Sequence, residues 1–204
     1  MPRHFTNEEK LVIEEKLLGA AKELFIQYGV SKTTISDITN RAGVGKGTFY
    51  LFYKSKGDIY VRLYWDEWVI IHDEIDAKYL GKKGRLEDLI VDYIYENRRQ
   101  LFSHPIIANI YERDALAIIS DKATNNRIAS FAELAKGRLI AIIKSWLDAN
   151  DIDCDVSPDV LSGMMRSVTY LTYHKDEVGE DIFADVIKNF ALGISLVATC
   201  KRDS

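Results

Sequence analysis

The sequence predicts an all-α protein of two parts, a three-helix domain over residues 1–54 and a larger helical domain over residues 55–204. Apolar residues recur at helical spacing along nearly the whole chain. No segment shows the strict apolar–polar alternation of a half-buried strand. Glycines, prolines and helix-capping residues divide the chain into about nine helical segments.

The composition fits a globular protein with a substantial core. Of the 204 residues, 47% are apolar and 28% are charged, and only three are prolines. The longest apolar runs fall far short of the roughly 20 residues that a membrane-spanning helix needs. No signal peptide is evident at the N-terminus. We therefore expect a cytoplasmic protein that has no membrane partner.

The first helix is expected over residues 8–28, with Glu and Lys opposite an apolar stripe. Gly29 is expected to end it, because glycine is a common residue just past the end of a helix. The apolar stripe consists of Leu11, Leu17, Leu18, Ala21, Leu24, Phe25 and Tyr28.

Two short helices are expected next. Thr34 and Asp37 have the spacing of a capping box, which opens the second helix of the domain. Gly43 ends this helix, since glycine adopts a left-handed conformation at little cost. The third helix covers residues 45–52, and Phe49 anchors it in the core.

Turn signals divide the second domain. Ser55 and Asp58 have the spacing of another capping box and open a helix that runs to about Tyr79. The two glycines at the ends of residues 81–84 form the clearest break in the chain. Beyond it, we expect helices over residues 85–102, 105–119, 122–149, 157–174 and 179–199.

Residues 34–56 have the pattern of a helix-turn-helix that binds nucleic acid. A helix in the major groove presents its first residues to base edges, while the flanking residues contact phosphates. Gly45 and Gly47 each cost roughly 1 kcal/mol relative to alanine in a helix interior. That cost is reasonable where the backbone must approach another surface closely. Lys46 and Thr48 lie on the exposed side of this helix.

Two further side chains of the stretch are placed to contact phosphate. Tyr50 follows the core residue Phe49 and therefore points away from the core. Lys56 occupies the first turn of the helix capped by Ser55, where a cation opposes the helix macrodipole by about 0.3–1 kcal/mol. A phosphate bound there would meet both the free amides and the ammonium.

The distribution of charge supports this interpretation. The whole chain has a net charge of −4. Residues 1–62, however, hold ten Lys and Arg against seven Asp and Glu, a net +3, and the remainder holds seventeen against twenty-four, a net −7. A basic surface on an acidic protein is typical of a small DNA-reading domain.

The same stretch resembles the DNA-binding domain of the tetracycline-repressor (TetR) family. The resemblance covers about residues 10–60, and the family implies a homodimer, a palindromic operator and release from DNA when a small molecule binds. The resemblance implies phosphate contacts by Thr34, Tyr50 and Lys56. It implies groove contacts by Ser36, Lys46, Gly47 and Thr48.

The motif departs from the family pattern at two places. Family members commonly have Tyr followed by Phe where this chain has Phe52 and Tyr53. They usually have an acidic residue where this chain has Gly57. The first departure predicts that position 52 loses a polar contact.

The second domain contains aromatic and polar residues suited to a small ligand between helices. The same residue types at helical spacing are more often plain core, and the sequence does not separate the two cases. The candidate pocket residues are Trp65, Trp68, His72, Tyr93, Asn97, Phe102, Tyr111, Met164 and Tyr170, with His174 as a further candidate.

No catalytic, cofactor or metal motif stands out. The four histidines are scattered without the spacing of metal ligands, and Cys154 and Cys200 form no metal or disulfide pattern. No Ser/His/Asp or Cys/His arrangement is apparent. We therefore expect no enzyme activity and no cofactor.

The last two helices have apolar faces that resemble the dimer interface of the family, in which two helices of each subunit form a four-helix bundle. Dimerisation would let two heads read paired half-sites. The candidate interface residues are Leu161, Met165, Val168, Val186, Phe190, Gly193, Ile194 and Val197.

The sequence thus favours a dimeric transcriptional regulator, most simply a repressor that a small molecule releases from its operator. An alternative is a DNA-binding scaffold or nucleoid-associated factor without an inducer, and activation in place of repression is also open. An enzyme with an accessory DNA-binding domain is remote. The effector, the operator and the regulated genes are not encoded in any recognisable motif.

Overall fold

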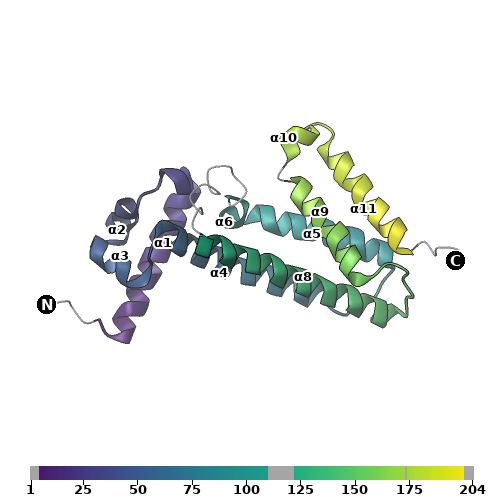
Figure 1. Ribbon diagram of the computed structural model, residues 1–204, viewed down its shortest axis with the longest axis horizontal. Helices are drawn as coiled ribbons and strands as arrows, with labels where there is room; N and C mark the ends of the chain where they lie inside the picture. Colours follow the sequence, from purple (N-terminus) through teal and green to yellow (C-terminus); the bar gives the residue numbers. More distant parts are fainter. Residues whose placement is uncertain (1–4, 110–121, 173, 200–204) are drawn as a thin grey trace. The chain divides into compact units, whose positions relative to one another are not determined.

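The computed structural model describes residues 5–109, 122–172 and 174–199, without the side chains of residues 122–125 and 128. Every regular element in these ranges is a helix, which confirms the all-α prediction, and ten helices are described (Figure 1). None of them is both long and apolar enough to cross a bilayer. The described residues form two compact units, one within Met1–Val69 and Ser103–Ala129, the other within Ile70–Phe102 and Ser130–Ser204.

The first unit contains the three helices expected at the N-terminus. They are α1 (Asn7–Lys32), α2 (Ile35–Ala42) and α3 (Lys46–Phe52). Gly29 interrupts α1 with φ +79° and ψ 159°, which confirms the predicted break. Thr6 and Glu9 form a capping box that opens α1.

Part of the stripe predicted for α1 is wrong. Leu17, Ala21 and Phe25 are buried as expected. Leu11 and Tyr28, however, are 62% and 53% exposed. These two residues lie near the ends of the predicted helix, and a helical period continues to the ends of a helix whether or not another helix packs there.

The core of the first unit also includes α6 (Pro105–Ala108) and the part of α4 (Lys56–Tyr79) up to Val69. The hydroxyl of buried Tyr60 donates a 2.6 Å hydrogen bond to the main-chain oxygen of Ile106. The ring of Tyr60 packs edge-on against Phe25 at 5.7 Å. These contacts join α1, α4 and α6. The predicted helix over residues 105–119 is described only as α6, and residues 110–119 lie outside the described ranges.

The second unit contains the rest of α4, α5 (Leu86–Ser103) up to Phe102, most of α8 (Lys122–Asn150), α9 (Pro158–Thr172), α10 (Lys175–Val178) and α11 (Phe183–Thr199). Fully buried Trp146 donates from Nε1 to the main-chain oxygen of Tyr79 at 2.7 Å. Its ring lies edge-on to those of Tyr79 and Tyr93, at 6.1 Å and 5.9 Å. This aromatic cluster joins α4, α5 and α8.

The helix predicted over residues 179–199 begins later than expected. Its first turn is replaced by a turn that begins at Gly179, where φ is +108°, and the short helix α10 directly precedes this turn. Helix α11 starts only at Phe183. The predicted start at Ser157 and Pro158 agrees with α9, because the main-chain N–H of Val160 donates to Ser157 Oγ at 3.3 Å.

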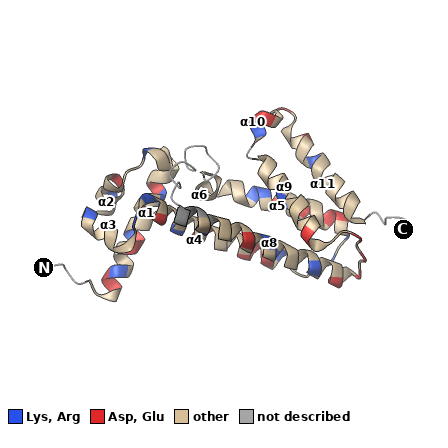
Figure 2. Ribbon diagram, viewed as in Figure 1, with Lys and Arg blue, Asp and Glu red and all other residues tan. Residues whose placement is uncertain are grey.

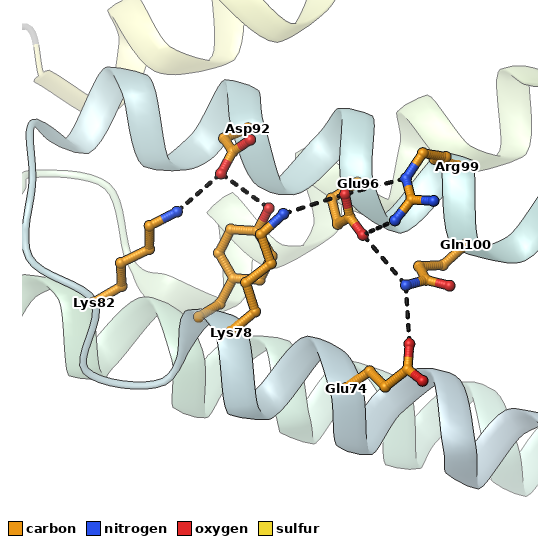
Figure 3. A network of polar contacts seen from close by, with 8 residues as sticks. Glu74, Lys78, Lys82, Asp92, Glu96, Arg99 and Gln100 are labelled. Atoms are coloured by element: carbon orange, nitrogen blue, oxygen red, sulfur yellow. Dashed lines mark hydrogen bonds and ion pairs between the residues drawn. The ribbon is translucent and has the colours of Figure 1, made fainter.

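Helices α4 and α5 are also joined by a polar network on their surface (Figure 3). The hydroxyl of Tyr79 donates to Asp92 Oδ2 at 3.0 Å, and Lys82 pairs with the same carboxylate at 2.9 Å. Glu96 accepts from Lys78 at 3.2 Å and also pairs with Arg99. These pairs hold the pKa values of both carboxyl groups below their usual range: side-chain hydrogen bonds outweigh the opposing effect of partial burial.

Candidate nucleic-acid interface

The turn between α2 and α3 is set by Gly43. It adopts the left-handed conformation, with φ +68° and ψ 32°, and its N–H donates to Asn40 O at 3.2 Å. The N–H of Val44 donates to Thr39 O at 3.0 Å. Both bonds satisfy carbonyl groups at the end of α2 and turn the chain into α3, as the sequence predicts.

Helix α3 presents its first turn to solvent. Lys46 and Gly47 are exposed and Thr48 is half-buried. Phe49 is fully buried, so it fixes the helix in the core as predicted, while Tyr50 is 52% exposed and crosses the Phe49 ring edge-on at 5.6 Å. Among the described residues, the hydroxyl of Tyr50 has no hydrogen-bond partner. The side chain is therefore free to meet a ligand outside the chain.

Gly47 has no packing reason to be glycine. A methyl group built at its Cα meets no atom within 4 Å, and its φ lies outside the left-handed region. Glycine in a helix costs about 0.5–1 kcal/mol relative to alanine. Since no contact within the described chain explains the residue, its small size suits a surface that comes close to α3 from outside.

Thr34 forms the predicted capping box, which occupies its side chain. The Asp37 N–H donates to Thr34 Oγ1 at 3.1 Å, and Asp37 Oδ2 accepts from the Thr34 N–H at 2.9 Å and from its hydroxyl at 2.6 Å. These bonds hold the pKa of the Asp37 carboxyl below its usual range. The groups that α2 can still offer to a phosphate are the N–H groups at its start and the exposed side chain of Ser36.

Lys56 is engaged within the unit. Its ammonium donates to three main-chain oxygens near the end of α1, those of Val30 at 2.6 Å, Ser31 at 3.3 Å and Thr33 at 2.7 Å. Partial burial lowers the pKa of this ammonium. Cations stabilise the carboxyl end of a helix, where carbonyl groups have no partner within the helix.

The capping box predicted at the start of α4 forms with one of its two hydrogen bonds moved to a neighbouring N–H. The N–H of Asp58 donates to Ser55 Oγ at 3.1 Å, as expected. Asp58 Oδ2 accepts from the N–H of Lys54 at 3.1 Å, where a regular box would use the N–H of the capping residue. Asp58 also pairs with Arg127. The result is a tightly fixed entry into α4, directly after α3.

The sequence does not predict the polar network around Tyr53. The hydroxyl of buried Tyr53 donates to Glu14 Oε1 at 2.9 Å, and Arg62 lies 3.4 Å from the same oxygen. Arg62 also holds Asp66 at 3.0 Å. Burial and the bond to Glu14 raise the pKa of the Tyr53 hydroxyl. The inverted aromatic pair at positions 52 and 53 is the signal that could have pointed to this bond from α1 to Tyr53, the residue that ends α3.

The local basic surface is smaller than the sequence suggests. Arg41 pairs with Glu23 at 2.7 Å, and Lys56 is engaged as described above. Lys32, Lys46 and Lys54 are exposed, and Asp37 is the single acidic residue of α2 and α3 (Figure 2).

The candidate pocket residues do not all fall in one unit. Trp65 and Trp68 belong to the first, where their rings stack at 5.4 Å and 9°. Tyr111 lies outside the described residues. In the second unit, Asn97 Nδ2 donates to Thr169 Oγ1 at 3.3 Å. There His72 and Tyr93 are buried, Asn97 and Met164 are half-buried, and Phe102 and Tyr170 are exposed, as is His174, which lies near Glu177.

The candidate dimer residues separate into two groups. Those that are buried within the single chain are Leu161, Met165 and Val168 of α9 and Ile194 of α11. Those left at the surface or half-buried are Val186, Phe190, Gly193 and Val197. Two more apolar residues are exposed there: Leu196 of α11 is 64% exposed, and Ile182, which directly precedes α11, is 50% exposed. Among the described residues, no cluster of His, Cys, Asp or Glu is arranged to hold a metal ion.

Helix α2 is capped, the turn after it is left-handed, and helix α3 is exposed and contains a glycine. The other regular elements of the described chain are helices as well. These features define a helix-turn-helix DNA-binding protein with a helical body. Residues 17–63 match the sequence model of the bacterial regulatory proteins of the tetR family. The chain belongs to this family of transcriptional regulators.

Similar proteins agree with this assignment. The chain is 24% identical to the Transposon Tn10 TetC protein of Escherichia coli over 190 residues, 88% of this chain and 91% of that protein. It is 36% identical to the HTH-type regulator YvdT of Bacillus subtilis over 95 residues, 38% of this chain and 48% of YvdT, so about half of that relative is spanned.

Solved structures share the fold. A putative TetR-family regulator from Syntrophomonas wolfei superposes with a TM-score of 0.69 at 21% identity, over 97% of this chain and 98% of that one. The regulator FadR of Bacillus subtilis, solved in complex with stearoyl-CoA, gives 0.65 at 18% identity, over 92% and 99%.

Proposed function

We propose that the protein is a homodimeric transcriptional repressor that binds a palindromic operator through α2 and α3 and is released by a small molecule. The main support for this DNA-binding surface is the first turn of α3. It combines exposed Lys46, the free hydroxyl of Tyr50 and a glycine at position 47 that no contact in the described chain requires. Such a turn suits a helix that enters a major groove.

The contacts divide by chemistry. Ser36, Lys46 and Thr48 offer a hydroxyl, an ammonium and a hydroxyl to base edges, and Gly47 lets the backbone come close. Tyr50 and the N–H groups at the start of α2, which follow Thr34, offer donors to phosphates. Lys56 contributes by fixing the carboxyl end of α1 next to Thr34.

Dimerisation is supported by the exposed apolar side of α11. Phe190, Leu196 and Val197 are each at least 39% exposed, and Val186 and Gly193 lie on the same side. Large apolar side chains gathered on one helix face usually mark an interface. A symmetric pair of such faces would join two copies and set the distance between their DNA-binding helices.

The effector part of the proposal is supported by the architecture and by related proteins. The described part of α4 contributes residues to both units, since the first unit ends at Val69 and the second begins at Ile70. A ligand that changes the second unit can therefore act on the helix that begins beside α3. FadR was solved with stearoyl-CoA and SmeT with triclosan, which shows that those relatives of the fold hold small molecules.

The proposal includes two domains. Residues 1–54 form the DNA-binding domain, and residues 55–204 form the ligand-binding and dimerisation domain. A scaffold without an inducer is the alternative, and it differs in having no ligand that changes DNA affinity. The apolar side of α11 does not separate the two, since both need a dimer.

The experiment is a selection of bound fragments from genomic DNA, followed by gel-shift measurement of the enriched sites. We expect enrichment of inverted repeats whose half-sites lie about one helical turn apart. Small molecules related to the products of the neighbouring genes are then added, and one class should lower the affinity. Absence of any enriched site would overturn the proposal, and enriched sites that no ligand affects would favour the scaffold.

A further inference from the structure

Two arginines of the second unit differ from all other arginines that the structure describes. Six of the eight described arginines form ion pairs with carboxylates, namely Arg41, Arg62, Arg85, Arg99, Arg127 and Arg138. Within the described ranges, Arg98 and Arg166 have neither an ion pair nor a hydrogen bond from their side chains. Arg99, the neighbour of Arg98 in sequence, pairs with Glu96 (Figure 3).

Both unpaired arginines are partly enclosed. The Nε atom of each is buried and has no acceptor in the described structure, although both residues are only half-buried as a whole. The Arg98 guanidinium lies 5.5 Å from the Phe183 ring and 5.8 Å from the Phe102 ring. Aromatic rings compensate a buried cation only in part. Burying an unpaired charge destabilises a folded chain, so an anion is expected to complete this site.

Arg166 stands in a polar stripe of α9 that faces α5. Ser162, Arg166 and Thr169 follow one another at four and three residues, and Ser162 Oγ is buried without a partner. Thr169 accepts the hydrogen bond from Asn97 on α5. Burial raises the pKa of Tyr93, one turn before Asn97, and the nearby Arg166 guanidinium opposes that rise.

The acidic group that also acts on Tyr93 pairs with a different arginine. Asp76 Oδ2 lies 3.1 Å from Arg138 Nε, while Asp76 Oδ1 is buried without a hydrogen-bond partner in the described structure, and Arg138 pairs with Asp73 as well. No described carboxylate lies within ion-pair distance of Arg98 or Arg166. Arg98, Arg166 and Ser162 therefore hold buried donor atoms that no acceptor in the described structure uses, and both arginines lack an ion-pair partner.

We propose that Arg98 and Arg166 bind the acidic head of a small organic anion, and that this anion is the effector. This rests on the proposed function, which requires an effector in the body. A guanidinium binds a carboxylate or a phosphate through two parallel hydrogen bonds. The rings of Tyr93, Phe102 and Phe183 suit an apolar or aromatic remainder of the ligand.

A pair of fluorescent probes tests the site on the full chain. 8-Anilinonaphthalene-1-sulfonate is an aromatic anion, and N-phenyl-1-naphthylamine is its uncharged counterpart. We expect Arg98→Met and Arg166→Met each to weaken binding of the anion by at least about tenfold and to leave the neutral probe unaffected. Displacement by octanoate or by octyl phosphate, with octan-1-ol as the neutral control, distinguishes a carboxylate head from a phosphate head.

The matched control is Arg99→Met, which removes an exposed, paired arginine and should leave both probes unaffected. Equal effects on the two probes, or none on the anion, would overturn the proposal. Thermal unfolding without ligand supplies an independent readout. Removing an unpaired buried charge should raise the melting temperature, whereas a melting temperature lowered by both Met variants, or loss of folding, would show that the arginines serve the fold and would contradict the anion site.

DNA binding separates this inference from the proposed function. On a selected fragment, Arg98→Met and Arg166→Met should bind like the wild type and should no longer respond to the displacing anion. A protein that is released by a neutral ligand, with both variants still responding, would overturn the anion site and leave the repressor standing. A protein that binds the anionic probe through these arginines but binds no DNA would overturn the repressor and leave the anion site standing.

Discussion

The ammonium of Lys56 lies 2.6 Å from the main-chain oxygen of Val30 and 2.7 Å from that of Thr33. A third bond, to Ser31 O at 3.3 Å, uses the last of its three donors. The first residue of α4 therefore fixes the end of α1, directly before Thr34, which caps α2. In this arrangement Lys56 has no donor left for a phosphate.

Lys56→Met should consequently lower the free energy of unfolding by about 1–3 kcal/mol, because hydrogen bonds to a charged donor are lost and their carbonyls are left without a partner. DNA affinity should also fall, with an unchanged slope of log affinity against log salt. Thermal unfolding and salt titrations of binding measure both. Lys54→Met is the control for the free energy of unfolding, since the side chain of Lys54 is exposed. A slope reduced by about 1 would instead show a direct phosphate contact.

Gly47→Ala should stabilise the protein and weaken DNA binding. The added methyl group meets open space in the described chain, and alanine is the better helix former by about 0.5–1 kcal/mol. Gly19→Ala is the matched control, because Gly19 is exposed within α1 and its methyl group also meets no neighbour. Both variants should melt at a higher temperature, and only the first should lose affinity. Unaltered affinity of Gly47→Ala would argue against close approach at this position.

Tyr53→Phe should cost about 1–3 kcal/mol, because it removes a hydrogen bond to a charged acceptor, Glu14. The loss should depend on pH. The pKa of Tyr53 is raised above its ordinary value of 10.0, so the contribution of its hydroxyl is complete below pH 10 and declines as the pH rises further. Denaturant unfolding of both proteins at pH 8 and above pH 10 should show the difference narrowing. A constant difference would mean that the hydroxyl does not remain protonated in the folded state.

Phe190→Glu should separate the proposed dimer into folded monomers, because this side chain is 49% exposed in the single chain. Sedimentation velocity gives the mass, and circular dichroism gives the helix content. Leu134→Glu, an equally exposed residue on α8, should remain dimeric. If Phe190→Glu remains dimeric as well, the interface lies on another face.

The sequence predicts the local features of the DNA-binding domain well. The capping box of Thr34 and Asp37, the left-handed Gly43 and buried Phe49 all depend on residues within four positions of one another or on helical period. Such features are determined by neighbouring residues and survive in any tertiary context.

Features that depend on distant contacts could not be predicted. Lys56 and Val30 lie 26 positions apart, and nothing in the motif shows that the ammonium turns toward α1. Likewise, the sequence cannot show that Arg98 and Arg166 lack a carboxylate partner, because this depends on where the surrounding carboxylates lie in the folded chain. Leu11 shows the opposite error, since its helical spacing is correct but no helix covers it.

The exposed first turn of α3 is proposed to read the DNA, and the affinity of a double variant in this turn gives the sharpest test. Fluorescence anisotropy on a selected fragment would compare the wild type with the double variant Lys46→Ala/Tyr50→Phe at one salt concentration. Both side chains are exposed, so folding should be unaffected. If this turn reads the DNA, the dissociation constant of the double variant should be at least about tenfold higher. Equal dissociation constants for the two folded proteins would contradict it.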